Sequence, residues 1–449
     1  MLQEIDCPIE AVVPTAPITP SKIVHLSTAE RKRTRSVRKL LFSSERTVRC
    51  ALKLYSVSHA TETKTFSDGA YMSDPLRYVS YLCEQSTFLA VGGDCGGGHC
   101  KLGVTYSHNA KQHFAALLVY DGGDKYADLV KLTERGVTQF VGESAPFTHI
   151  FAVLQHLIDT RNAFLNGDWL FLNVVLGLKS AASTHPCPIC IVTHHNYLRS
   201  GTYRTAAHKH SQHKDQPALL AVPSDRIVPT PLHVFLGLSN RIIGKVYPRL
   251  FGEQAVFEAV KRIKTLHSAG CSGLSDLWDL NGQEISKWVK KECSRTLPAT
   301  SDSAKATHSI LSRWLTDMHH CLLHAKDWLP ADIEAWRAVV DDIKLHWVSE
   351  TQIEPFPKLH MLLHSVDFAE RYRFLGRASE AQIEAFHPIF NELFHKQHRN
   401  KSKDTAERMR RCLANTSTRA MRPMLKRKAA EADLDPPVAG ITRSTSSPV

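Results

Sequence analysis

The chain has 449 residues, of which 43% are hydrophobic and 22% charged, and it carries a net charge of +12. These values are ordinary for a globular protein with two or three domains. The eleven cysteines are few for this length and odd in number, which argues against a disulfide framework and favours reduced thiols with one metal site. The first residues lack a secretory signal and no apolar run is long enough to span a membrane, so we expect a soluble intracellular protein.

The positive charge is concentrated in two segments. Between Arg31 and Lys53 nine Lys or Arg residues stand against one acid, and between Lys396 and Lys428 twelve stand against two. Because nucleic-acid binding begins with the neutralisation of phosphates, this distribution indicates a polyanion as the partner. The alternative is that both segments are solvated charged tails.

The first third of the chain predicts a tail, a basic segment and then a small sheet. Residues 1–30 are rich in Pro, Thr and Ser and predict a loose tail, and a basic, helix-compatible stretch follows from Ala29 to Tyr55. Apolar runs separated by Gly-rich or polar breaks come next, at Phe88–Gly93, Lys101–Tyr106 and Phe114–Tyr120. Runs and breaks of this kind predict a three-stranded antiparallel meander.

Helices then alternate with a further strand. Pro146–Thr160 has the apolar spacing of a helix, Ala163–Leu165 predicts a short strand, and Trp169–Leu178 predicts an apolar helix. The order strand–strand–strand–helix–strand–helix is that of the beginning of a ribonuclease-H-like α/β fold with a mixed sheet. In that fold acids stand on the first strand and at the end of the fourth, and Asp94 and Asp168 stand at those two places.

A large all-α insertion is predicted from Pro231 to Trp347, after a polar, His-rich loop from Gly201 to Pro229. Six of the seven Trp residues lie in this region, which is consistent with a separate helical core. The segments with helical spacing are Leu232–Val246, Ala255–Leu266, Glu284–Cys293, Thr307–His324 and Ala331–Trp347. The α/β core resumes at Lys358 and ends with a helix from Ser379 to Phe394, for which Ser379 is the expected N-cap.

These elements divide the chain into five expected parts. A flexible tail with the basic segment occupies 1–55, and the first part of the α/β core with a zinc knuckle occupies 84–195. The helical insertion occupies 196–355, the completion of the core 356–412, and a disordered basic tail 413–449.

Two separated pairs of residues have the spacing of zinc ligands. Cys187-Pro-Ile-Cys190 is a knuckle of two thiols, and His360-Met-Leu-Leu-His364 places two imidazoles at i, i+4 on a helix. Together they supply four tetrahedral ligands, and one zinc ion bound by both pairs would join the two halves of the chain. A local Cys2His2 site remains open as an alternative. Its candidate histidines are His194, His195, His208, His210 and His213.

Three acids have the placement expected of a catalytic magnesium centre. Asp94 lies in a Gly-rich turn, Asp168 follows the fourth strand, and Glu384 lies on the last core helix. Mg²⁺ or Mn²⁺ prefers a few carboxylates and leaves room for water and phosphate. Two such ions can serve an in-line displacement at phosphorus. The glycines after Asp94 are expected to permit a tight turn and to let backbone approach a phosphate. Taken alone, Asp94 reads as a turn acid and Asp168 as a helix N-cap.

Some neighbouring residues leave alternatives open. Glu380 stands one helical turn before Glu384, and we prefer Glu384 because it lies further from the capping turn. His387 could contact DNA phosphate or orient Glu384, but a packed or surface histidine is the plainer interpretation. Further acids follow the third strand and read as surface turn residues: Asp121, Asp124 and Asp128.

At these residues the chain resembles DDE-type cut-and-paste DNA transposases. The matching stretches are GGDCGGGHCKLG, NGDWLFLNVVLGLKSAASTHPCPIC, PTPLHVFLGLSN, KLHMLLH and LGRASEAQIEAFH, which together span about residues 88–394. The spacing of the acids, the Cys pair and the His pair is also similar to that in the catalytic core of the antigen-receptor recombinase and its Transib relatives. The resemblance implies a ribonuclease-H-like core with a helical insertion before the last acid.

The resemblance also implies roles for the named residues. Asp94, Asp168 and Glu384 would form the magnesium-binding catalytic triad, and the two Cys and two His residues would bind a structural zinc ion. The implied chemistry is hydrolysis of a phosphodiester at the end of a transposable element, followed by strand transfer from the freed 3′-hydroxyl. The expected partner is double-stranded DNA, with a homodimer as one option, and the expected location is the nucleus.

One departure from the family leaves a second function open. The sequence shows no zinc finger or helix-turn-helix that would read the ends of an element, although the basic segment from Arg31 to Lys53 could be the remnant of one. The alternative to an active enzyme is therefore a domesticated, catalytically silent transposase that acts as a DNA-binding or scaffold protein. A third interpretation is a zinc-stapled protein-interaction module with unrelated acids.

Overall fold

The computed structural model describes residues 61–434 apart from short gaps, and residues 60–422 form one compact unit. The gaps are at 85, 87, 109–110, 135–137, 143–144, 180–182, 200, 206–215, 265–279, 294–300 and 400–401. The expected tail and basic segment at 1–55 lie outside the described residues. Among the described helices none is long and apolar enough to cross a membrane.

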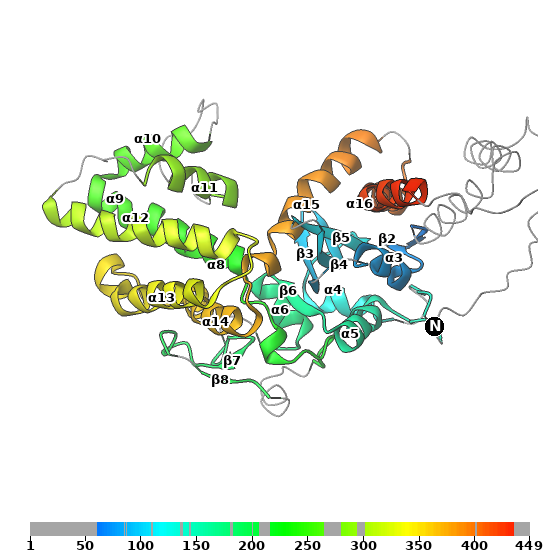
Figure 1. Ribbon diagram of the computed structural model, residues 1–449, viewed down its shortest axis with the longest axis horizontal. Helices are drawn as coiled ribbons and strands as arrows, with labels where there is room; N and C mark the ends of the chain where they lie inside the picture. Colours follow the sequence, from blue (N-terminus) through cyan, green and yellow to red (C-terminus); the bar gives the residue numbers. More distant parts are fainter. Residues whose placement is uncertain are drawn as a thin grey trace, which may run out of the picture. The chain divides into compact units, whose positions relative to one another are not determined.

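The chain is an α/β protein with a mixed six-stranded sheet followed by a large helical region, as the coarse fold prediction stated (Figure 1). The strand order is β1-β2-β5-β4-β3-β6. The strands are β1 (Thr63–Phe66), β2 (Gly69–Met72), β3 (Leu89–Gly96), β4 (His99–His108), β5 (Lys111–Tyr120) and β6 (Phe164–Gly167). The hairpin β1–β2 was not expected from the sequence, and it extends the meander by pairing with β5.

Strand direction places three carboxyl ends at one edge of the sheet. β4 is antiparallel to both β3 and β5, and β6 is parallel to β3, so β3, β5 and β6 all run the same way. In the register of β3 and β6, Gly93 lies opposite Gly167. The residues that follow them, Asp94 and Asp168, therefore stand side by side at this edge.

Among the described residues, helices separate the strands of the sheet and one more helix follows the last strand. They are α3 (Pro75–Leu82), α4 (Tyr126–Lys131), α5 (Ile150–Arg161) and α6 (Trp169–Val175). Helix α6 ends three residues before the predicted Leu178. Gly177 has φ +65° and the Leu178 amide donates to the Asn173 carbonyl, so the chain turns out of the helix there.

The helical region begins later than the predicted boundary at 196. A small hairpin, β7 (Cys190–Ile191) with β8 (Thr202–Tyr203), comes first, and Ile227 then forms a parallel bridge to Leu165 of β6. The segment before 229 thus packs against the sheet, because its apolar residues complete the core beside β6. From Pro231 to Thr351 the regular elements among the described residues are helical. They are α8 (Pro231–Arg241), a π-helical turn η4 (Ile242–Val246), α9 (Tyr247–Phe251), α10 (Glu253–Lys264), α11 (Gly282–Lys291), α12 (Asp302–Leu323) and α13 (Pro330–Thr351).

The helical region has its own aromatic core. Its largest fully buried side chains are indoles, Trp288, Trp314, Trp336 and Trp347. Helix α14 (Pro357–Tyr372) packs against both α8 and α13. It thereby links the helical region to the residues that follow.

The last core helix lies against the sheet. It consists of α15 (Ala381–Glu392) and a π-helical turn η7 (Leu393–Gln397), and α15 packs on β3 and β5. The expected N-cap was wrong by one residue: Glu380 occupies the N-cap position, because a 3-10 turn, η6 (Gly376–Ala378), ends just before it. The Ser379 hydroxyl instead accepts from the Ala381 amide and stabilises the entry turn.

The expectation of a disordered tail from Leu413 was wrong for the residues described there. Helix α16 runs from Thr405 to Leu434. Leu413, Ser417 and Met421 recur every four residues and are buried, so they form one buried face of the helix. The Ser417 hydroxyl also lies 3.7 Å from the Met72 sulfur of β2. The polar composition of this segment concealed a helix that contacts β2 of the sheet.

Candidate metal centres

The first centre is the group formed by the two Cys and two His residues, all of which the fold brings together. Their ligand atoms lie within 4.8 Å of one another. Cys190 Sγ is 3.1 Å from His360 Nε2, Cys187 Sγ is 3.5 Å from His364 Nε2, and the two Nε2 atoms are 3.1 Å apart. Each of the four residues is 3% exposed or less. We call this set the Cys2His2 group.

Local structure places each half of this group. The Ile189 and Cys190 amides point at Cys187 Sγ, at 3.4 and 3.5 Å, which is the conformation of a thiolate knuckle. On α14 the spacing of four residues puts both imidazoles on one face. Because α14 packs against α8 and α13, the Cys2His2 group connects the loop after α6 with the end of the helical region.

Surrounding groups suit a bound cation with thiolate ligands. His360 Nδ1 is 3.0 Å from the Tyr197 carbonyl, a contact that leaves Nε2 free to bind metal. Arg204 donates to the Cys187 and His185 carbonyls at 2.7 Å and brings positive charge beside the sulfurs. Burial would raise the pKa of Cys187, but hydrogen bonds from Cys190 and the imidazoles lower it well below its usual range. The donor set and its burial fit zinc, so the group could bind that ion.

The alternative local site lacks support among the described residues. His194 and His195 are exposed and belong to none of the ligand groups found there. The other three candidates, His208, His210 and His213, lie outside the described residues.

The second centre is at the sheet edge where β3, β5 and β6 end. Two ligand groups share Asp94, one with Glu384 and His387 and the other with Asp124 and Asp168. We call Asp94, Asp124, Asp168 and Glu384 the carboxylate edge. Asp94 Oδ1 accepts from the Cys95 amide at 2.7 Å, and Asp168 Oδ1 caps α6 by accepting from the Phe171 amide at 2.6 Å. Asp168 is thus both an N-cap and a neighbour of Asp94.

Asp124 is the member of this edge that the sequence did not identify. It was interpreted as a surface turn acid, because it follows β5 in a polar turn. The strand order could have signalled its place, since β5 runs parallel to β3 and therefore ends at the same edge. The antiparallel meander predicted from the sequence already implies this direction for β5.

Of the two candidate acids on the last helix, Glu384 is the one beside Asp94. Glu380 is only 2% exposed and one of its oxygens accepts from both the amide and Nδ1 of His233 at 2.8 Å. His233 Nε2 lies 3.5 Å from Glu384. His233, on the first turn of α8, thus bridges the two acids, a role that the sequence did not suggest for it.

The carboxylates of this edge perturb one another's pKa values. Burial and the nearby Asp94 charge raise the pKa of Glu384 to about 7. Burial, with Asp94 again contributing, also raises the pKa of Asp168 and of Asp124. Burial would raise the pKa of Asp94 as well, but hydrogen bonds from His387 and Glu384 lower it. The acids could therefore bind a metal, whose charge would relieve the repulsion.

The Gly-rich segment makes a tight hairpin turn, as predicted. Gly97 and Gly98 make the two-residue turn between β3 and β4 with φ of +65° and +84°, as a tight hairpin requires. A Cβ at Gly96 would lie 2.6 Å from the His387 ring, and one at Gly97 would lie 2.1 Å from Asn391. Gly96 and Gly97 therefore also make room for α15.

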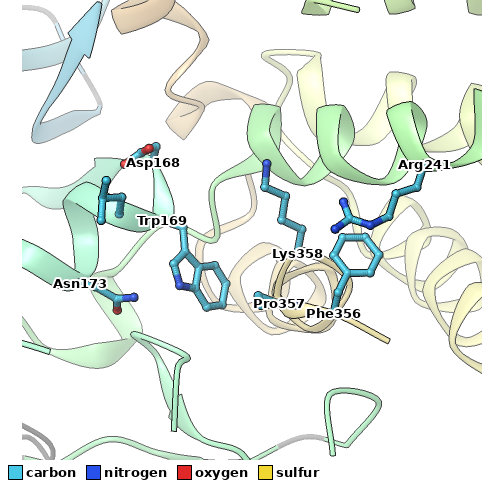
Figure 2. Close-up of a pocket in the computed structure, with 8 residues that line it drawn as sticks. Asp168, Trp169, Asn173, Arg241, Phe356, Pro357 and Lys358 are labelled. Carbon is cyan, nitrogen blue, oxygen red and sulfur yellow. The ribbon is translucent and has the colours of Figure 1, made fainter. Parts of the chain in front are cut away.

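A pocket of about 310 Å³ adjoins the carboxylate edge at Asp168. It lies between the starts of α6 and α14 and the end of α8, and Figure 2 shows Arg241 above the Phe356 ring and Trp169 facing the pocket. The Arg241 guanidinium is 3.6 Å from the Phe356 ring centroid. The residues that line the pocket are Asp168, Trp169, Leu170, Asn173, Arg241, Phe356, Pro357 and Lys358. The walls thus combine two cations with two aromatic rings.

Neither a scan against models of known protein families nor a search of curated proteins finds a match for this chain.

Proposed function

We propose that this chain is a metal-dependent enzyme that cuts and joins DNA, with a ribonuclease-H-like core of the DDE-transposase type. The observation that carries the proposal is the convergence of Asp94, Asp168 and Glu384 on one edge of the sheet. These acids lie far apart in the sequence, on β3, after β6 and on α15. The succession of three antiparallel strands, a helical segment, a fourth strand and a further helix, with a large helical region before α15, is the one expected of such a core.

The carboxylate edge has the chemistry that divalent cations require. Asp94 belongs to both ligand groups, so it would be shared between two Mg²⁺ or Mn²⁺ ions, with Asp168 on one side and Glu384 on the other. Hard oxygen ligands in a partly exposed site suit these ions and leave positions for water and phosphate. When bound, paired divalent cations activate the attacking oxygen and stabilise the leaving oxygen of an in-line displacement at phosphorus.

The chain's own residues would place the substrate beside those acids. Lys358 and Arg241 line the pocket next to Asp168 and would attract a phosphodiester backbone. Trp169 adds an aromatic wall for apolar contact with sugar or base, and the Phe356 ring supports the Arg241 guanidinium. The Cys2His2 group would hold α14 in place and so keep Lys358, at the start of that helix, in the pocket beside Asp168.

Cleavage of supercoiled plasmid DNA by the purified protein tests this proposal. The wild type should nick DNA with Mg²⁺ or Mn²⁺, and Asp94→Asn should reduce the rate by at least about 100-fold, because the shared ligand to both cations is lost. Asp159→Asn, on the exposed side of α5, is the matched control and should nick at the wild-type rate.

Two other outcomes would select other functions. A wild-type protein that binds duplex DNA with strong salt dependence but never cleaves it would be a catalytically silent DNA-binding or scaffold protein. A protein with neither cleavage nor DNA affinity would be a zinc-stapled interaction module, and its acids would have no catalytic role.

A further inference from the structure

Lys101 is a fully buried lysine on β4, close to the carboxylate edge but outside the set of acids. Its ammonium donates to the Gly96 and His99 carbonyls, the latter at 3.0 Å, and lies 2.9 Å from His387 Nδ1. The Phe390 ring centroid is 5.2 Å away. Burying a cation is costly unless each of its protons is used, and here three acceptors surround it. Burial lowers the pKa of Lys101 to about 8, so at neutral pH the amine is still mostly charged.

The Lys101 contact fixes which His387 nitrogen carries a proton. An ammonium can only donate, so His387 Nδ1 must accept, and the proton of a neutral imidazole then resides on Nε2. His387 Nε2 is 3.1 Å from Asp94 Oδ2. The proton on Nε2 therefore points at the carboxylate shared by the two ligand groups. Gly96 allows this approach, because a Cβ there would overlap the ring.

The contacts from Lys101 through His387 to Asp94 leave His387 unable to bind a metal ion itself. With Nδ1 turned to Lys101 and Nε2 protonated, neither nitrogen of His387 offers a lone pair to a cation. His387 thus lies close enough to be counted as a ligand, yet it faces Asp94 as a hydrogen-bond donor. Asp94 is held at both oxygens, by the Cys95 amide at Oδ1 and by His387 at Oδ2.

We propose that Lys101 and His387 are positioning residues that orient the Asp94 carboxylate for metal binding and exclude His387 from the ligand set. This inference rests on the proposed function, because it gives Asp94 its role as the shared ligand. Partners of this kind, which orient a metal ligand, typically affect metal affinity or activity by about 10–100-fold. The competing explanation is a purely structural tie between the β3–β4 turn and α15.

The test measures Mn²⁺ binding and plasmid nicking side by side. His387→Phe keeps the ring but loses both hydrogen bonds, and His387→Gln keeps an N–H donor near the position of Nε2. We expect His387→Phe and Lys101→Met to weaken Mn²⁺ binding or nicking by about 10–100-fold, and His387→Gln to recover much of the loss. His395→Phe and Lys111→Met, both at exposed positions, are the matched controls and should behave as wild type.

Each remaining outcome decides the matter. A purely structural tie would lower the melting temperature of His387→Phe while leaving its Mn²⁺ titration at the wild-type midpoint, which would overturn the inference. If Lys101→Met does not fold, the contrast between His387→Phe and His387→Gln still decides. If the wild type binds Mn²⁺ and nicks DNA, and His387→Phe and Lys101→Met do so equally well, only the positioning role is overturned. Wild-type protein that binds no Mn²⁺ overturns the proposed function together with this inference.

Discussion

The two candidate metal centres of this chain differ in burial and in ligand chemistry. The Cys2His2 group consists of soft sulfur and imidazole ligands, each 3% exposed or less. The carboxylate edge consists of hard oxygen ligands, and its Glu384 side chain is 38% exposed. A closed site with four protein ligands is typical of structural zinc, whereas an open, oxygen-rich site is typical of a catalytic divalent cation. One compact unit thus contains two different centres. The Cys2His2 group would hold secondary-structure elements together, and the carboxylate edge would face a substrate.

The difference also explains where each centre lies. The Cys2His2 group joins the knuckle after α6 to α14, so it connects segments more than 150 residues apart in sequence. The acids of the carboxylate edge are also distant in sequence, but they meet because they lie at or after the ends of strands that run the same way and on one helix packed on those strands. If this division is correct, damage to the first centre should unfold the protein, and damage to the second should spare the fold.

The largest expected effect is the loss of a zinc ligand. We expect about one zinc per chain in the wild type, and His360→Ala should release it and loosen or unfold the protein. Structural zinc sites contribute apparent binding free energies of about 10–16 kcal/mol, which is comparable to the whole stability of a typical protein of about 5–15 kcal/mol. Metal analysis and far-UV circular dichroism measure the two results.

The controls for this prediction come from both centres. Cys321→Ala, at a half-buried thiol outside the Cys2His2 group, should keep its zinc. Asp94→Asn should keep both its zinc and its fold. A His360→Ala protein that retains its zinc would show that the metal lies elsewhere, with the histidines between 194 and 213 as the next ligands to examine.

The second prediction concerns Asp124, the acid that the sequence analysis assigned to a surface turn. If it belongs to the carboxylate edge, Asp124→Asn should weaken Mn²⁺ binding or nicking by about 10–100-fold without affecting zinc content. Asp121→Asn, an exposed acid three residues earlier, is the matched control. Equal behaviour of the two variants would remove Asp124 from the site and leave three acids.

Asp124 also illustrates what could be predicted from the sequence and what could not. The meander, the strand before Asp168, the helical region and α14 follow local periodicity, and their approximate positions were predicted. The sheet order was not, because the pairing of β2 with β5 joins Gly69 to Tyr120, and the sequence between them gives no sign of that contact. Asp124 takes its role from the direction of β5 relative to β3, which the predicted meander implies, and not from its neighbours in the chain.

Interactions between distant side chains escaped prediction for the same reason. His233 and Glu380 are 147 residues apart, and Lys101 and His387 are 286 apart. Each pair forms only because α8 and α15 pack near the ends of the strands. The four residues of the Cys2His2 group were easier to find, since each half has a characteristic local spacing. Short spacings can be recognised in a sequence, whereas long-range partners require the fold.

The smallest expected effect is a pH-dependent change in stability at Glu384. The unfolded chain releases this proton near the ordinary pKa of 4.5, whereas the folded protein releases it only near 7. Between these values the folded state binds more protons, so the contribution of Glu384 to stability is complete below pH 4.5 and is lost as the pH rises through 7. Discounted for the exposure of its side chain, this loss is roughly 1.5 kcal/mol at pH 8.

Replacing the acid with a neutral isostere should therefore stabilise the metal-free protein at high pH. Glu384→Gln should unfold at higher denaturant concentration than wild type at pH 8 and at nearly the same concentration at pH 4.5. Added Mg²⁺ should narrow the difference at pH 8, because the cation stabilises only the charged acid. Glu258→Gln, on the surface of α10, should show no such pH dependence. A Glu384→Gln protein that is no more stable at pH 8 would mean that repulsion at the carboxylate edge is negligible, and the contrast with the Cys2His2 group would then rest on ligand chemistry and burial alone.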